Sequence, residues 1–127
     1  MTLNELRDEA YTTAKEKGWH DSPRSPLEIH MLIVSEVAEA TEEVRNARPS
    51  FFLESDGELY TLINVEKIES GLIDPGEKPC GEAVELADAV IRIANYFGER
   101  GWDLDGIIRA KMDYNKTRSH RHGGKTI

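Results

Sequence analysis

The sequence predicts an all-α fold with one short β-hairpin insertion around residues 50–63. Apolar residues recur at helical spacing in four stretches, three of which begin at a capping residue. The segment between the second and third stretches is rich in glycine and proline and contains two short runs typical of strands. A length of 127 residues suits one domain, because it is enough for a single core and too short for two.

The first helix is expected over residues 3–17. Residues 2–5 have the spacing of a capping box, and Gly18 ends the helical pattern. A polar loop follows, and it opens with Trp19 and His20. Trp19 has two open interpretations, a packing residue or an aromatic that stacks on a ligand.

The second helix is expected over residues 26–46, because residues 25–28 form another capping box with proline at the first helical position. Its run from Leu32 to Val44 is typical of a buried helix, yet it contains Glu36 and Glu39. At 100° per residue, these two acids share one face beside the apolar stripe. A buried carboxylate is costly unless it is paired or bound to a cation. Taken alone, such a pair is more often a solvated helix edge.

Residues 47–81 differ in character from the helices around them. Residues 51–53 and 59–63 resemble two short strands around an Asp-Gly turn at Asp56 and Gly57. A lone hairpin is marginally stable in water, so it is expected to pack on the helices or on a partner subunit. The stretch from there to Gly81 is predicted to be a loop that acts as a lid.

The third helix, expected over residues 82–100, carries Glu85 and Asp88 in the same geometry as the first acid pair. Two helices packed along these faces would bring four carboxylates to one place. Ligands that offer only oxygen suit Mg²⁺ or Mn²⁺ better than zinc. Arg92 lies four residues after Asp88, the spacing of a surface ion pair within one helix.

The last helix is expected over residues 104–117, with Asp103 as its cap. Lys111, Asn115 and Arg118 recur on one of its faces, although a basic helix face is more often solvated than functional. After it, two glycines precede Lys125 and permit a tight turn close to a phosphate.

Charge and composition narrow the classes of partner. Residues 109–127 carry a net charge of +5, which leaves −13 for residues 1–108 because the whole chain carries −8. An acidic body repels a polyanion, so no nucleic acid is expected as partner. The sequence shows no apolar run long enough for a membrane span, no secretory signal and a single cysteine, Cys80. The expectation is therefore a cytoplasmic protein without a membrane partner.

Taken in order, these motifs resemble the MazG-like nucleoside triphosphate pyrophosphohydrolases of the all-α NTP pyrophosphatase superfamily. The resemblance covers about residues 26–46 and 78–125. It is carried by the following segments: Glu36-x-x-Glu39, Lys78-Pro79-x-Gly81, Glu85-Leu86-Ala87-Asp88-x-x-Ile91-Arg92, Lys111-Met112-x-Tyr114-Asn115-x-x-Arg118 and His122-Gly123-Gly124-Lys125. Two features depart from the family pattern, Ser35 in place of a doubled acid and the long insertion at 47–77.

The resemblance implies a four-helix bundle, a homodimer or homotetramer, and Mg²⁺-dependent cleavage of a (deoxy)nucleoside triphosphate to monophosphate and pyrophosphate, as in nucleotide-pool housecleaning. It implies four metal ligands: Glu36, Glu39, Glu85 and Asp88. It also implies that Asn115 binds the nucleotide, that Trp19 or His20 reaches the base, and that Lys111 and Arg118 neutralise phosphates.

The expected mechanism is attack of a metal-activated water on the α-phosphate. Glu39 is expected to orient the water, and three cations to stabilise the leaving pyrophosphate: Lys111, Arg118 and Lys125. Two alternatives remain open. One is activity like that of phosphoribosyl-ATP pyrophosphohydrolase, and the other is a non-catalytic helical module that binds nucleotide or a partner. The second acid pair favours an enzyme, because a scaffold does not require four oxygen ligands.

Overall fold

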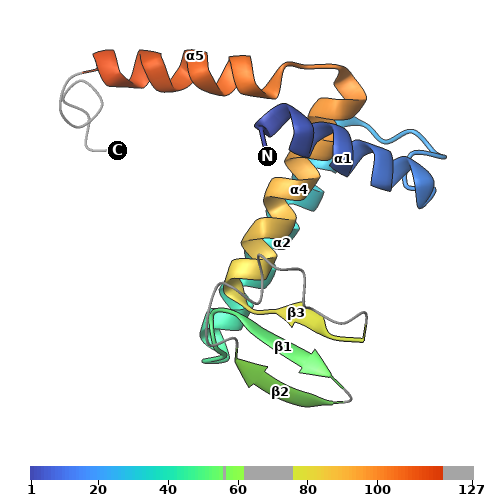
Figure 1. Ribbon diagram of the computed structural model, residues 1–127, viewed down its shortest axis with the longest axis vertical. Coiled ribbons are helices and arrows are strands. Elements are labelled where there is room, and N and C mark those ends of the chain that lie inside the picture. The colour runs from blue at the N-terminus through green and yellow to red at the C-terminus, as the bar shows by residue number, and fades with distance from the viewer. Residues whose placement is uncertain (56, 62–75, 119–127) are drawn as a thin grey trace. The chain divides into compact units, whose positions relative to one another are not determined.

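The computed structural model describes residues 1–55, 57–61 and 76–118, which are mostly helical with a small antiparallel sheet (Figure 1). The chain divides into two compact units. Unit 1 consists of Met1–Ser22 and Ala94–Ile127, and unit 2 of Pro23–Ile93. The boundary between Ile93 and Ala94 lies within one helix, Glu82–Arg100. The prediction of a single domain stays a prediction.

The helices of the described residues confirm the prediction to within one residue at each end. They are α1 (Leu3–Glu16), α2 (Pro26–Arg45), α4 (Glu82–Arg100) and α5 (Leu104–Thr117). The predicted caps are also present. The side chains of Thr2, Ser25 and Asp103 each accept a hydrogen bond from a backbone N–H in the first turn of their helix.

In unit 1, the first turns of α1 and α5 cap each other. The two carboxylate oxygens of Asp105 accept hydrogen bonds from the N–H groups of Leu3 and Asn4, each at 3.1 Å. In return, Oδ1 of Asn4 accepts from the N–H groups of Leu104 at 2.9 Å and Asp105 at 3.2 Å. These bonds satisfy helix N-terminal donors that have no partner within their own helix.

Close packing of α1 on the last turns of α4 completes unit 1. A side chain at Gly98 would lie 2.5 Å from Cβ of Tyr11, so this position requires glycine. Trp102 contacts the rings of Tyr96 and Phe97 edge to face, with centroids 5.5 and 5.3 Å apart. Such edge-to-face pairs add to the stability gained from burial of the rings.

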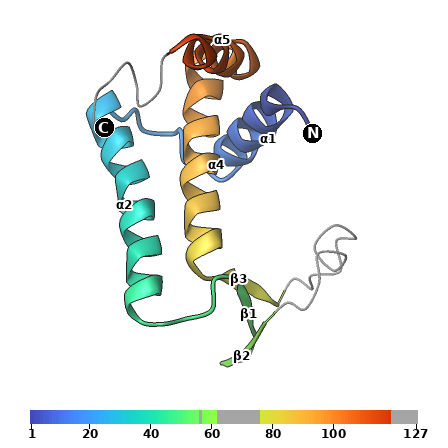
Figure 2. The same cartoon turned by 90° about the vertical axis from the view of Figure 1, so that its left-hand side faces the viewer.

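In unit 2, α2 and the beginning of α4 run antiparallel and side by side (Figure 2). The sheet follows α2 in the chain and precedes α4. At Gly81, φ is +109°, and an added Cβ would lie 2.6 Å from the carbonyl oxygen of Ser50. The same oxygen accepts a hydrogen bond from the N–H of Ala83 at 2.9 Å. The start of α4 is thereby fixed against the segment that leads into the sheet.

The sheet has the order β2-β1-β3, with β1 (Phe52–Ser55), β2 (Glu58–Thr61) and β3 (Lys78–Cys80) all antiparallel to their neighbours. Phe52 and Leu53 are fully buried although successive strand residues point to opposite faces, so both faces of β1 are covered. The backbone pairing of β1 with β2 confirms the predicted hairpin, whose turn residue Asp56 lies outside the described residues.

Strand β3 corrects the sequence prediction, which assigned residues 64–81 to a loop. Pro79 lies within this strand although proline has no N–H to donate to a ladder. In the structure it pairs with Leu53 on an edge strand, where a missing N–H is tolerated. The rest of the predicted lid, residues 64–75, lies outside the described residues.

The apolar stripes beside the acid pairs are more exposed than the sequence predicts. Val37 and Val44 of α2 are 45% and 56% exposed, and Leu86 and Val90 of α4 are 43% and 51% exposed. The prediction that the run from Leu32 to Val44 is a buried helix is therefore wrong for Val37 and Val44. Among the helices of the described residues, none is long and apolar enough to cross a membrane.

Candidate metal centre

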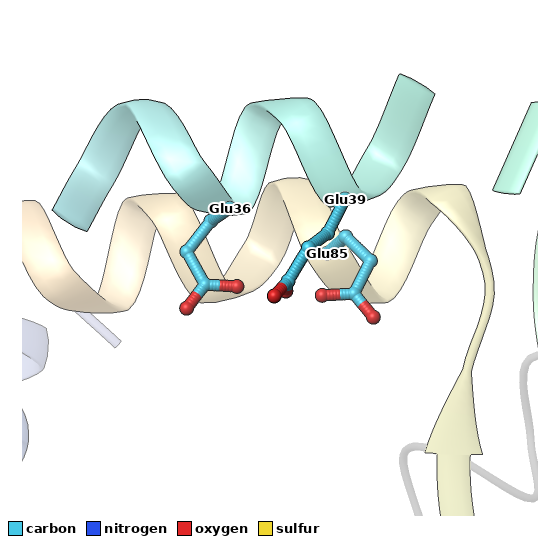
Figure 3. A group of neighbouring side chains, drawn as sticks. All are labelled: Glu36, Glu39 and Glu85. Atoms are coloured by element: carbon cyan, nitrogen blue, oxygen red, sulfur yellow. The ribbon is translucent and has the colours of Figure 1, made fainter. Parts of the chain in front are cut away.

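Three carboxylates from two helices meet in unit 2. One oxygen each of Glu36, Glu39 and Glu85 lies within 4.8 Å of the others. Figure 3 shows that Glu36 and Glu39 come from α2, and that Glu85 of α4 lies next to Glu39. We refer to these three residues as the acid cluster. The i, i+3 spacing on α2 and the antiparallel neighbour α4 together produce this convergence, as the sequence predicts.

The three members of the acid cluster differ in burial. Glu36 is the one buried charged residue of the described part of the chain, at 8% exposure, while Glu85 is partly buried and Glu39 exposed. Ala40 of α2 and Ala89 of α4 are also buried, each one residue after an acid of the predicted set.

Burial, together with the crowding of like charges, changes the ionisation of Glu85. Burial raises its pKa to about 7, and a hydrogen bond to Glu39 and the negative charges of Glu39, Asp88 and Glu36 act in the same direction. Carboxylates that share a partly buried site disfavour one another's charged form unless a cation compensates them. Such perturbed acids are common at functional sites.

Asp88, the fourth predicted ligand, lies at the margin of the acid cluster. Its oxygens are not part of the group that converges within 4.8 Å. Its pKa is raised by burial first and then by the charge of Glu36, against an opposing effect from Arg92. Asp88 therefore lies close enough to Glu36 and Arg92 to sense both charges.

Arg92 has a different partner from the one that its sequence position suggests. Its Nε donates a hydrogen bond to Oε1 of Glu36 at 2.7 Å, which joins α4 to α2. The sequence favoured a surface pair with Asp88 in the same helix. The signal for the interhelical pair was present, since helical spacing places Arg92 on the same face of α4 as Glu85.

The donor set of the acid cluster fits a hard divalent cation. All three groups offer oxygen, the ligand atom that Mg²⁺ and Mn²⁺ prefer. Opposite oxygens around Mg²⁺ lie about 4.2 Å apart, so a spread of 4.8 Å requires only small side-chain rotations to close on an ion. A cation would also offset the repulsion between the carboxylates, which adds to the effect of burial on the pKa of Glu85.

The predicted base-binding residues lie in unit 1, where Trp19 and His20 have different surroundings. Trp19 is 59% exposed. His20 is held in place, with its Nδ1 2.8 Å from Oε2 of Glu99 and its Nε2 2.7 Å from Oδ1 of Asn95. Both ring nitrogens of His20 are thus engaged within the unit, and Trp19 is the exposed aromatic of this loop.

The predicted phosphate-binding residues lie on and just after α5, also in unit 1. Lys111 and Arg118 lie over the ring of Tyr114, with Nζ 4.9 Å and Cζ 5.9 Å from its centroid. Asn115 is exposed on the same helix. The structure therefore brings the two cations to one aromatic ring. Lys125 lies outside the described residues.

Comparisons of this chain with protein-family models, with curated proteins and with solved structures found no match.

Proposed function

We propose that the protein is a Mg²⁺-dependent nucleoside triphosphate pyrophosphohydrolase with a MazG-like helical bundle. In this proposal it cleaves (deoxy)nucleoside triphosphates to monophosphate and pyrophosphate, as a housecleaning enzyme of the nucleotide pool. The observation that carries the proposal is the convergence of Glu36, Glu39 and Glu85 within 4.8 Å. The resemblance of the ordered motifs adds the substrate class to this metal chemistry.

Glu36, Glu39 and Glu85 would hold the cation, and Asp88 would complete the set from the margin of the cluster. Bound Mg²⁺ would supply a water of lowered pKa and offset the charge of the triphosphate. Glu39, the exposed member of the acid cluster, is the residue that we assign to orient the attacking water. An exposed carboxylate suits this role because substrate and water can reach it.

The remaining residues would bind the nucleotide. We assign the triphosphate to Lys111, Arg118 and Lys125, whose positive charges stabilise the leaving pyrophosphate, and we assign a nucleotide contact to Asn115. Of the two candidates for the base, Trp19 is favoured over His20 because the ring nitrogens of His20 already contact Asn95 and Glu99. An aromatic face stacks on any base.

We also propose that the protein is a homodimer or homotetramer. The support is the exposure of apolar side chains on α2 and α4, among them Val44 and Val90, which are each more than half exposed. Exposed apolar patches mark interaction sites, and a second copy of the chain supplies the same patch. Light scattering of the purified protein at micromolar concentration measures the mass, and a monomer would contradict this part of the proposal.

The test of the function is pyrophosphate release from a panel of oxidised, deoxy and ordinary nucleoside triphosphates and phosphoribosyl-ATP, with Mg²⁺ and with EDTA. We expect at least one substrate to yield monophosphate and pyrophosphate only with Mg²⁺. Glu39→Ala and Asp88→Ala should abolish this release while the circular dichroism spectrum stays helical. Full turnover in both variants would exclude the assigned site, and inactivity on the whole panel would favour a non-catalytic nucleotide-binding module.

A further inference from the structure

Arg92 provides the positive charge that contacts the acid cluster in the described part of the chain. Its Nε donates to Oε1 of Glu36 at 2.7 Å, and the Glu36 side chain is 11% exposed. Charge-assisted hydrogen bonds are strong, and exclusion of water strengthens them further. The guanidinium therefore compensates the most buried acid of the cluster.

The same carboxylate is needed by a divalent cation. Glu36 is one of the three residues whose oxygens converge, and one of its two oxygens is already bonded to Arg92. A divalent ion and a guanidinium at one carboxylate repel each other, and this repulsion is screened less at a partly buried site than in water. Because of this repulsion, we expect binding of the ion to weaken the contact with Arg92.

We infer that Arg92 is an internal counter-ion of Glu36, which stabilises unit 2 without metal and competes with a divalent cation for the Glu36 carboxylate. The inference rests on the proposed metal site and adds a residue that limits its affinity. It predicts that the site binds metal weakly alone and more firmly with a triphosphate. The triphosphate contributes negative charge and so offsets the repulsion between the two cations.

The test is titration of the purified full chain with Mn²⁺ by calorimetry, without nucleotide. Arg92→Met removes the charge but keeps most of the side-chain length. It should tighten Mn²⁺ binding roughly tenfold and lower the melting temperature of the metal-free protein. Arg92→Lys keeps the charge and should bind Mn²⁺ within about threefold of the wild type.

Arg45→Met is the matched control. It changes the net charge of unit 2 by the same amount, but Arg45 is an exposed residue that pairs with Glu42 at 3.5 Å. Its loss should leave the Mn²⁺ affinity unchanged, because surface pairs contribute little and are screened by salt. An equal gain of affinity in Arg45→Met would show a general charge effect and would overturn the specific role of Arg92.

Two results separate the inference from the proposed function. If the wild type binds Mn²⁺ and Arg92→Met binds it equally or more weakly, Arg92 is no competitor and the metal site stands. If neither protein binds Mn²⁺ at millimolar concentration, the metal site itself is wrong.

A measurement on the wild type covers the case in which Arg92→Met does not fold. The Nε–H group of Arg92 should exchange slowly with water in the metal-free protein, because it is bonded to Glu36. Addition of Mg²⁺ should speed this exchange at least about threefold as the contact weakens. Unchanged exchange at saturating Mg²⁺ would overturn the inference.

Discussion

Two groups of acids in this chain have opposite surroundings. Asp103 and Asp105 at the start of α5 accept hydrogen bonds from donors, mainly backbone N–H groups. Hydrogen bonds from Asn4 and Gly106 keep the pKa of Asp103 below its ordinary value. The acid cluster of unit 2 instead faces other carboxylates, and burial together with this crowding raises the pKa of Glu85 to about 7.

The contrast separates acids whose charge stabilises the fold from acids whose charges repel one another. An ionised carboxylate surrounded by N–H donors favours the native state, whereas neighbouring carboxylates disfavour it until a cation arrives. Only Glu36 has a cationic partner in the described part of the cluster, and that partner is Arg92. Neutralising one acid in each group should therefore have opposite effects on stability.

The largest effect is expected for Glu85→Gln. This variant keeps the shape of the side chain but removes a charge that the metal-free fold tolerates poorly. We expect Mn²⁺ affinity to fall at least about thirtyfold, since an amide is a weak ligand for a hard cation, while the metal-free protein melts at a higher temperature. Calorimetry and thermal unfolding in EDTA measure the two quantities. A lower melting temperature of Glu85→Gln than of the wild type in EDTA would mean that Glu85 stabilises the metal-free fold.

A smaller effect, of opposite sign, is expected for Asp105→Ala in unit 1. The substitution leaves the N–H groups of Leu3 and Asn4 without their acceptor. Loss of such a cap costs about 1–2 kcal/mol in the free energy of unfolding, which urea denaturation measures. Mn²⁺ affinity should not change, and a parallel loss of binding would show that the division between fold-stabilising and ligand-binding acids is wrong.

Features fixed by neighbours along the chain could be predicted from the sequence. Spacing within a few residues determines the bounds of the helices and their caps at Thr2 and Asp103. It also places Glu36 and Glu39 on one face of their helix. The structure also confirms that Glu85 meets this pair. That expectation needed only the further assumption that the two helices pack along their acidic faces.

Contacts between distant residues could not be predicted in the same way. The pairing of Arg92 with Glu36 and the capping of α1 by Asp105 join residues 56 and at least 101 positions apart. Spacing within one helix says which residues share a face but not how a second helix is aligned with it. Exposure of Val44 and Val90 was missed for a related reason, because an apolar stripe looks the same whether its own chain or another chain covers it.

The smallest effect is the dependence of metal-free stability on pH, in which the two groups of acids should again differ in sign. Because the pKa of Glu85 is raised from 4.5 to about 7 in the folded chain, the native state binds this proton more tightly than the unfolded state does. Protonated Glu85 therefore contributes to the free energy of unfolding. This contribution is fully present below pH 4.5 and is lost as the pH rises through about 7. Partial exposure of the side chain limits the size of the effect.

Asp103 behaves in the opposite way, since its pKa is lowered from 3.8. Its contribution is present above pH 3.8 and is lost as the pH falls through the lowered value. Urea unfolding in EDTA between pH 3 and pH 8 should therefore show a decline above pH 4.5 that Glu85→Gln flattens, and a decline in acid that Asp103→Asn flattens. If the free energy of unfolding of Glu85→Gln falls between pH 5 and pH 7 as steeply as that of the wild type, the charge of Glu85 does not destabilise the metal-free fold.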